Sequence, residues 1–200
     1  MRRPRRKAED TRAEILDTAE LLFARNGISG CSIAHIAQAL GMSPANVFKH
    51  FHSKISLADA ICDRHIVKMV DRLKAVETEA PAPERLGVVV RQLMNIHLEA
   101  MREAPFMFEM ILMLAETKIA SGRHYEQMLQ SLFCDLIRHG VESGVYYCSD
   151  PIRRGRAVAA AFACVLHPVF LVNEPPEELQ ARCDETVELV NIALQNPLAK

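Results

Sequence analysis

The stretch of residues 32–54 constrains the fold of this chain more than any other part of its 200 residues. Apolar residues recur at the spacing of one helix face over 33–40, Gly41 interrupts the pattern, and Val47 and Phe51 form a second pair four residues apart. Two short helices joined by a turn of about 3 to 4 residues that contains glycine form a helix-turn-helix, whose second helix enters the DNA major groove. The stretch therefore predicts a unit that reads DNA.

Capping residues mark where these helices begin. Ser32 precedes the first apolar position, and Ser43 places a capping hydroxyl before Pro44, a residue favoured at the first helical position. Upstream, a capping box at 11–14 and a stop at Gly27 predict another helix. The three helices are expected to share one core, made of Ile15, Ala19, Leu22, Phe23, Ile36, Ala37, Leu40, Val47 and Phe51.

The composition indicates a globular protein without a membrane span. Hydrophobic residues make up 50% of the chain and charged residues 24%, which is ordinary for a soluble domain. No apolar run approaches the ~18 to 20 residues that cross a bilayer, and the basic start lacks the apolar core of a secretory signal. The six cysteines lack Cys-x-x-Cys spacing and are interpreted as core or surface residues. We expect a cytoplasmic protein with no cofactor, no metal site and no membrane partner.

The charges are distributed unevenly along the chain. Residues 1–54 hold nine Lys/Arg and five Asp/Glu, a net charge of +4, which leaves 15 and 20, a net charge of −5, for the remainder. A basic first quarter attracts phosphate, whereas the acidic remainder is repelled by a polyanion. Residues 1–8 are expected to be a basic, disordered arm that reaches DNA. A merely solvated terminus is the alternative.

A proline-rich turn at 79–83 divides the chain. Residues 9–69 form the expected DNA-binding domain, which ends in a fourth helix that begins near Lys54 and ties the small bundle to something larger. Residues 80–200 contain helical patterns at about 84–103, 105–117, 122–143, 151–172 and 176–195, which gives an all-α fold of about nine helices. His167-Pro168 lies inside one pattern, so that helix should kink or end early. The only weak sign of a strand is at 145–148.

Specific residues of the helix-turn-helix resemble those of a known family. The DNA-binding domain of the TetR (tetracycline-repressor) family of bacterial transcriptional regulators is similar in residue type and spacing at Gly27, Ile36-Ala37, Leu40-Gly41-Met42-Ser43, Val47-Phe48-Lys49-His50-Phe51 and Lys54. The resemblance covers about residues 9–69, with the helix-turn-helix at 32–51. The chain departs from the family at Phe48, where a tyrosine is common and its hydroxyl typically reaches a phosphate.

The resemblance implies which residues contact DNA. It places Asn46 at the tip of the recognition helix, where an asparagine can pair with adenine, while Ala45 can touch a thymine methyl. Lys49 lies where the family grips phosphates. The full set of expected DNA-binding residues is Ser32, Pro44, Ala45, Asn46, Phe48, Lys49, His50 and Lys54, with Arg5, Arg6 and Lys7 of the arm.

The run 157–166 is apolar on almost every face, so the helix that contains it must be covered on all sides. A central core helix would meet that requirement. The TetR resemblance implies instead that the last two helices pair with their copies in a homodimer. Such a dimer supplies the two contacts that a palindromic operator requires.

Flexible apolar residues are concentrated in the middle of the chain, and methionine is common on surfaces that adapt to different ligands. On these residues alone, ordinary core packing is the favoured explanation. The resemblance implies a C-terminal helical domain that encloses a small-molecule pocket and also dimerises. The expected ligand-binding residues are Met94, His97, Met110, Met113, Phe133 and Phe162, around a largely apolar inducer.

Motifs of enzymes are missing from the sequence. It contains no Gly-x-Ser-x-Gly, no glycine-rich phosphate loop, no His-Glu-x-x-His and no Cys/His cluster with zinc spacing. We therefore expect a DNA-binding transcriptional regulator, a repressor released by its ligand and controlling an efflux or detoxification operon. A helical scaffold that uses the basic arm to bind partners is the alternative, and a helical enzyme comes after it.

Overall fold

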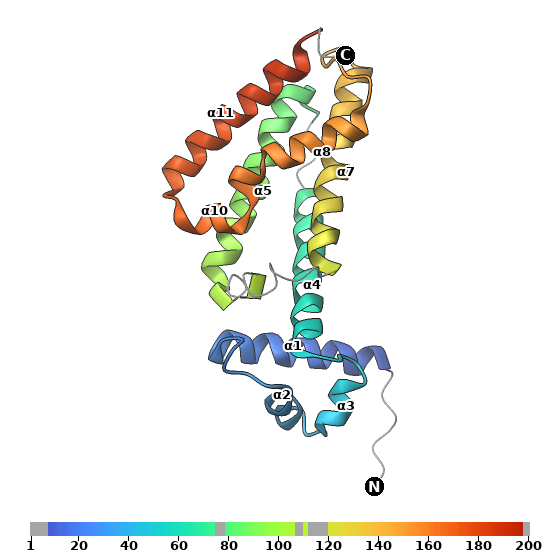
Figure 1. Cartoon of the computed structure of the whole chain (residues 1–200), viewed down its shortest axis with the longest axis vertical. Helices are drawn as coiled ribbons and strands as arrows, with labels where there is room; N and C mark the ends of the chain where they lie inside the picture. Colours follow the sequence, from blue (N-terminus) through green and yellow to red (C-terminus); the bar gives the residue numbers. More distant parts are fainter. Residues whose placement is uncertain (1–7, 75–78, 107–109, 112–119, 198–200) are drawn as a thin grey trace. The chain divides into compact units, whose positions relative to one another are not determined.

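The computed structural model describes residues 8–74, 79–106, 110–111 and 120–197, and within these ranges it contains helices and no strand (Figure 1). The all-α prediction is confirmed. The helices are α1 (Ala8–Asn26), α2 (Ile33–Ala39), α3 (Pro44–Phe48), α4 (Lys54–Lys74), α5 (Ala82–Glu103), α7 (Ala120–Glu142), α8 (Pro151–Ala161), α9 (Ala163–Leu166), α10 (Pro168–Asn173) and α11 (Pro176–Gln195). Within the described ranges, none of these helices is long and apolar enough to cross a membrane.

The chain divides into two compact units. The first combines residues 1–65 with 101–121, and the second combines 66–100 with 122–200. The helices α4, α5 and α7 each continue from one unit into the other. The predicted domain limits at 69 and 80 remain a prediction.

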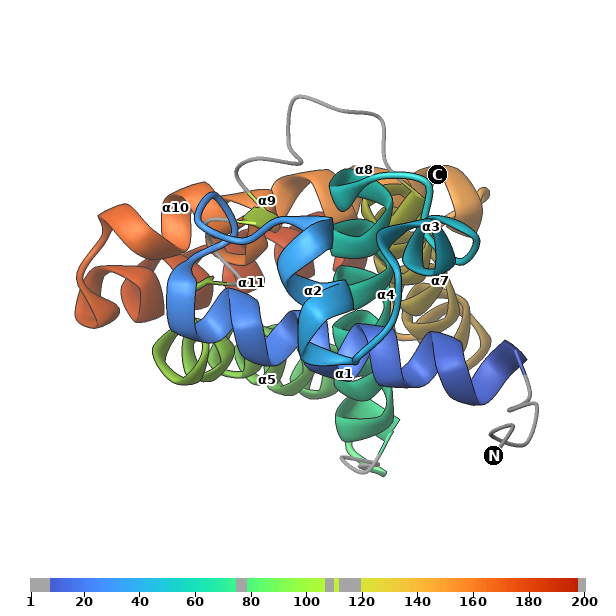
Figure 2. The same cartoon turned by 90° about the horizontal axis from the view of Figure 1, so that it is seen from below.

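The first unit is built around a buried apolar cluster that α1, α2, α3 and the start of α4 share. In this unit α2 and α3 lie on the same side of α1 (Figures 1 and 2). Seven of the nine predicted core residues are buried, while Leu22 and Leu40 are half-buried at its edge. Leu57 and Ile61 of α4 complete the cluster, so the expected fourth helix does anchor the bundle.

Three aromatic side chains organise the second unit. Phe133 of α7 stacks on Phe162 at the end of α8, with ring centroids 5.4 Å apart and both side chains fully buried. Tyr146 follows α7 and packs against Gly140, where a Cβ would lie 2.2 Å from the tyrosine ring. The Tyr146 hydroxyl donates to Asn191 Oδ1 at 2.6 Å, which ties the end of α7 to α11.

The local expectations about helix boundaries were met in part. The predicted helix at 151–172 is divided into α8, α9 and α10. The expected break at His167-Pro168 is confirmed, since His167 takes an extended conformation (φ −79°, ψ 130°). The break at Phe162 was not expected; there the Val165 N–H donates to the carbonyl of Phe162, three residues earlier, which closes a tighter turn. Helix α1 begins at Ala8, so the predicted capping box at 11–14 lies inside the helix. Residues 145–148 form no strand. The ten described helices replace the expected nine, and most of the predicted helix at 105–117 lies outside the described residues.

Candidate nucleic-acid interface and ligand-sensing residues

Capping bonds set the helix-turn-helix geometry. The Ser32 hydroxyl accepts from the His35 backbone N–H at 3.2 Å, and the Ser32 N–H donates to His35 Nδ1 at 3.4 Å. Ser43 Oγ accepts from the Asn46 N–H at 3.3 Å, with Pro44 as the first helical residue. Gly41 has φ +63°, a left-handed conformation that ends α2 and that other residues adopt at a cost. Both predicted start signals and the glycine stop are confirmed.

The recognition helix α3 presents one side to the core and the other to solvent. Val47 is fully buried, whereas Pro44, Ala45, Phe48 and Lys49 are exposed. The second group therefore forms a continuous accessible face on a helix whose other side is fixed by packing. Ser32 at the start of α2 is also exposed, while Asn46 and His50 are half-buried.

Asn46 lies at the edge of this face. Its side-chain amide nitrogen is 3.6 Å from the sulfur of Met42, a weak acceptor. The amide is thus loosely oriented by its own neighbourhood. The basic-arm residues Arg5, Arg6 and Lys7 lie outside the described residues.

Lys54 lies in a different environment from the other predicted DNA contacts. Its ammonium group donates to the carbonyl oxygens of Ile28 at 2.8 Å and Cys31 at 3.1 Å, in the loop between α1 and α2. The side chain is half-buried. Lys54 therefore joins the start of α4 to the loop that precedes the helix-turn-helix, a role that the sequence did not indicate.

Arg12 is a further basic residue near the recognition helix. Its guanidinium group lies 4.6 Å from the centre of the Phe51 ring, directly after α3, in a cation–π contact. The two residues are 39 positions apart, so no local spacing could have indicated the pair. Arg12 is an additional candidate for a phosphate contact, because it is exposed and held beside α3.

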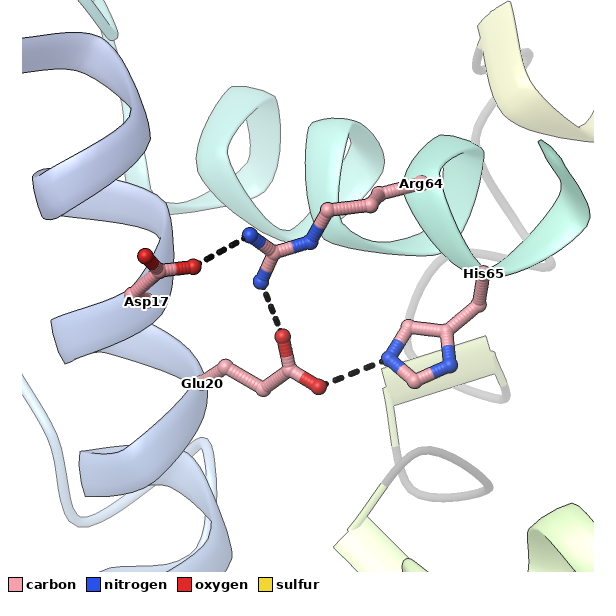
Figure 3. A network of polar contacts seen from close by, with 4 residues as sticks. All are labelled: Asp17, Glu20, Arg64 and His65. Atoms are coloured by element: carbon pink, nitrogen blue, oxygen red, sulfur yellow. Dashed lines mark hydrogen bonds and ion pairs between the residues drawn. The ribbon is translucent and has the colours of Figure 1, made fainter. Parts of the chain in front are cut away.

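An ionic network joins α1 to α4 (Figure 3). Arg64 of α4 donates to the carboxylates of Asp17 and Glu20 on α1, and His65 Nε2 lies 2.8 Å from Glu20 Oε1. The hydrogen bond from His65, together with the charges of His65 and Arg64, lowers the pKa of Glu20 to about 2, against a smaller opposing effect of burial. This network fixes α1 on the part of α4 that belongs to the first unit.

The predicted ligand-binding residues are divided between the two units. Met94, Phe133 and Phe162 are buried in the second unit, where the last two stack. Met110 is fully buried in the apolar cluster of the first unit, and Met113 lies outside the described residues. The structure thus does not place Met110 with the aromatic pair.

His97 has a partner that the sequence did not reveal. His97 Nε2 on α5 lies 2.7 Å from the hydroxyl of Tyr125 on α7, and the rings meet edge to face. Burial lowers the pKa of His97 to about 4 and raises the pKa of Tyr125 above its ordinary value. Both side chains are therefore uncharged at neutral pH.

Metal-ligating side chains and cysteines are the remaining candidates for a chemical role. Among the described residues, His, Cys, Asp and Glu side chains form no group of three or more that could hold a metal ion. Cys31, Cys62, Cys134 and Cys183 are buried, in agreement with their interpretation as core residues, and Cys148 and Cys164 are half-buried.

Large apolar side chains are exposed on the helices at the end of the chain. Ile152 of α8 is 63% exposed, and Leu189 and Ile192 of α11 are 67% and 59% exposed. Leu189 and Ile192 are three residues apart, so they lie on the same face of α11. This face is a candidate surface for a second copy of the chain.

The capped helix-turn-helix with one buried and one exposed face of α3 defines a DNA-reading unit joined to a helical domain. Family models agree with this class: residues 15–61 match the bacterial regulatory proteins of the tetR family, and residues 82–187 match the tetracyclin repressor-like C-terminal domain. The chain belongs to the TetR family of DNA-binding transcriptional regulators. Members of this family are regulators and not enzymes, as expected.

Individual relatives are distant. The HTH-type transcriptional regulator TtgR of Pseudomonas putida is 27% identical over 104 residues, which cover 52% of this chain and 49% of TtgR. The chain thus spans about half the length of the first curated relatives that it matches. The fatty acid degradation regulator FadR of Bacillus halodurans is similar in structure, with a TM-score of 0.63, 18% identity and coverage of 94% and 96% of the two chains.

Another solved structure shares the fold. A transcriptional regulator from Saccharomonospora viridis in complex with choline has a TM-score of 0.62 and 24% identity, and the match covers 90% of this chain and 96% of that one. At this level of identity the likeness extends to the fold alone.

Proposed function

We propose that this chain is a homodimeric, sequence-specific repressor that acts in the cytoplasm and leaves a palindromic DNA operator when a small ligand binds to its second unit. Members of the TetR family often control efflux or detoxification operons, and we propose an operon of this kind as the target. The distant similarity to the transcriptional regulator TtgR agrees with a regulatory role.

The observation that carries this proposal is the exposed face of α3. Its inner residue, Val47, is fully buried, so the helix is held rigidly while Pro44, Ala45 and Lys49 face solvent. An exposed helix face supported in this way fits the major groove, where base edges carry a distinct pattern of donors, acceptors and thymine methyl groups.

The proposed contacts fall into two groups. Asn46 and Ala45 read bases, and Pro44 sets the start of the helix that carries them. Backbone phosphates are contacted by Ser32, Lys49, His50 and Lys54 and by Arg5, Arg6 and Lys7 of the arm. Phe48 lies at the DNA-facing position but has no donor for a phosphate, so its proposed contact with DNA is apolar. The ammonium group of Lys54 also donates to two carbonyl groups.

The homodimer is proposed to form through the last helices. Exposed Leu189 and Ile192 on one face of α11, with Ile152 on α8, are apolar surface that a second copy would cover. A two-fold symmetric pair would present two recognition helices to the half-sites of a palindrome.

The ligand is proposed to be small, uncharged and mostly apolar. Met94, Phe133 and Phe162 supply apolar side chains in the second unit, and His97 with Tyr125 supplies an uncharged hydrogen-bonding pair. Such a set favours burial of apolar surface, at about 25 cal/mol per Å², with one polar group to orient the ligand. Met110 is assigned to the first unit, and Met113 stays a prediction.

The test is selection of DNA from a random-sequence library by the purified full chain. A repressor of this kind should enrich a palindrome and keep a large preference for it while all affinities fall with salt. Equal binding of every duplex would instead favour the scaffold alternative, in which only the basic arm attracts phosphate. Addition of candidate ligands to the selected complex then measures release.

A further inference from the structure

The start of α7 is capped by a residue of another helix. The backbone N–H groups of Ala120 and Ser121 donate to the carboxylate of Asp59 on α4, at 3.2 Å to Oδ2 and 2.9 Å to Oδ1. Helix N-termini leave N–H groups without partners, and the preceding residue normally supplies the acceptor. Ile119 precedes Ala120 in the sequence, and its side chain contains no hydrogen-bond acceptor. Asp59 therefore supplies the acceptor from a position 61 residues away.

The two bonds differ in their exposure to water: the bond from Ser121 is partly buried, and the bond from Ala120 is exposed. Ser121 is 2% exposed and Asp59 is half-buried. Hydrogen bonds from backbone N–H groups to a carboxylate are charge-assisted, and a negative charge at a helix N-terminus is favoured by the helix dipole. Partial burial strengthens both effects at the bond from Ser121. Asp59 is thus a firm attachment point for the first turn of α7.

Apolar packing attaches the same segment to the same unit. Met110 is fully buried and Phe106 is 9% exposed within the cluster formed by α1 to α4, and Ala104 and Ile111 pack against it. Residues 101–121 accordingly belong to the first unit, although they follow 35 residues of the second. The cap and the apolar contacts are independent observations that bind the segment to the helix-turn-helix unit.

We propose that Asp59 is a positioning residue that couples the ligand-sensing unit to the DNA-reading unit by holding the first turn of α7 on α4. This inference rests on the proposed function. Asp59 lies five residues after Lys54, which itself holds the loop before the helix-turn-helix, and Tyr125 lies five residues after Ala120 on α7. A ligand that displaces α7 at Tyr125 thus acts on the turn that Asp59 holds.

Coupling of this kind is reciprocal. If release of the α7 start weakens operator binding, operator binding must strengthen the α7 start by the same factor. A residue with only a structural role would show no such response to DNA. Amide hydrogen exchange in the first turn of α7, with and without DNA, is therefore the diagnostic measurement.

The experiment uses the full chain and the duplex that it selects from a random library. In the wild type we expect operator binding to slow exchange in the peptide covering residues 120–125 by about tenfold, within the usual range of coupling. Asp59→Asn keeps the shape of the side chain but loses its charge and one acceptor oxygen. This variant should exchange faster in the same peptide without DNA, and DNA should change its exchange by less than about threefold.

Two further variants make the result specific. Ala120→Pro removes one donor at an exposed first helical position, where proline is tolerated, and should reproduce the effect of Asp59→Asn without any change in charge. Asp135→Asn is the matched control, because Asp135 is an exposed carboxylate on α7 that pairs within its own helix with Arg138. The control should behave as the wild type does.

The outcomes separate the inference from the proposed function. If the amides of residues 120–125 exchange at the wild-type rate in both Asp59→Asn and Ala120→Pro, the cap does not hold α7. If operator binding does not change the exchange of these amides in the wild type, Asp59 has only a structural role. Either result overturns the inference while leaving DNA binding intact. Failure of the wild type to select any duplex overturns the proposed function, whereas the comparison without DNA still tests the cap.

Discussion

Asn46 combines a half-buried position with a weakly held amide. Its amide nitrogen has the Met42 sulfur as a partner at 3.6 Å, so little free energy is lost when the amide turns to a base. We expect Asn46→Ala to reduce discrimination at one position of each half-site by about 1 to 3 kcal/mol, with unchanged affinity for unrelated DNA. Competition binding with single-base operator variants measures this. An equal loss on every sequence would identify Asn46 as a backbone contact.

Lys54 and Lys49 should respond differently to the same substitution. Lys54→Ala leaves the Ile28 and Cys31 carbonyl groups without a charged donor, so the free energy of unfolding should fall by about 1 to 3 kcal/mol. Lys49→Ala removes an exposed side chain and should leave stability within about 0.5 kcal/mol while lowering the salt slope of DNA binding by about one. Urea unfolding and affinity at several salt concentrations give both quantities. If Lys54→Ala unfolds like the wild type and lowers the slope, Lys54 is a phosphate contact only.

Sequence reasoning succeeded with single residues where the partner is close in the chain. Ser32, Ser43 and Gly41 could be assigned because a cap and its helix lie within four residues. It could not find the partners of Lys54, Arg12 or His97, which are between 23 and 39 residues away. Hydrophobic periodicity shows which face of a helix is apolar, but it does not show which residues pack against that face.

At the scale of elements, the network between α1 and α4 predicts sensitivity to acid. The pKa of Glu20 is about 2 in the folded chain and 4.5 for the free group, so the carboxylate stabilises the fold fully above pH 4.5. This contribution is lost as the pH falls from about 5 towards 2, because the unfolded chain then binds the proton first. We expect Glu20→Gln to lose about 1 to 3 kcal/mol of unfolding free energy at pH 7 and much less at pH 3.

Urea unfolding at the two pH values checks this prediction. Glu142→Gln is the control, since Glu142 is exposed at the end of α7 and should show nearly the same stability as the wild type at both pH values. A Glu20→Gln variant with the same deficit at pH 3 as at pH 7 would mean that the lost contribution is packing and not charge.

The helices themselves were predicted unequally well. The long, strongly periodic helices α5, α7 and α11 lie within two residues of their expected bounds at every end, because breakers mark them on both sides. The prediction of one helix across 151–172 missed the break at Phe162, because apolar residues continue through this position without a breaker. The tight turn there is visible only in the hydrogen bonds. Pro168 was the one local sign of a break, and it did mark one.

For the whole molecule, dimerisation through α11 is the prediction that matters most. Glutamates in place of Leu189 and Ile192 would put charge on an apolar face, so the double variant should be monomeric by light scattering. Loss of the second recognition helix should weaken operator binding by about a hundredfold or more. Leu21→Glu is the control, because Leu21 is also 60% exposed but lies on α1, and it should leave the dimer intact. A double variant that remains dimeric would place the interface elsewhere.

The overall plan was predictable, but the division of the chain into units was not. The proline-rich turn at 79–83 indicated two parts, and the residue pattern of the helix-turn-helix indicated the family, which the family models confirm. The segment 101–121 returns to the first unit, and Met110 with it. A methionine on an apolar face has the same pattern in either unit, so sequence reasoning placed Met110 with the ligand-binding residues.

The contact between Gly140 and Tyr146 restricts how this sequence can change over evolutionary time. A methyl group at position 140 would overlap the tyrosine ring, and that ring holds Asn191, whose amide in turn donates to the carbonyl of Pro83. A mutation at position 140 alone would therefore disturb the ends of three helices at once. Lineages that carry a larger residue at 140 should have replaced Tyr146 first, so the two positions are expected to covary among relatives, with glycine retained wherever the tyrosine is.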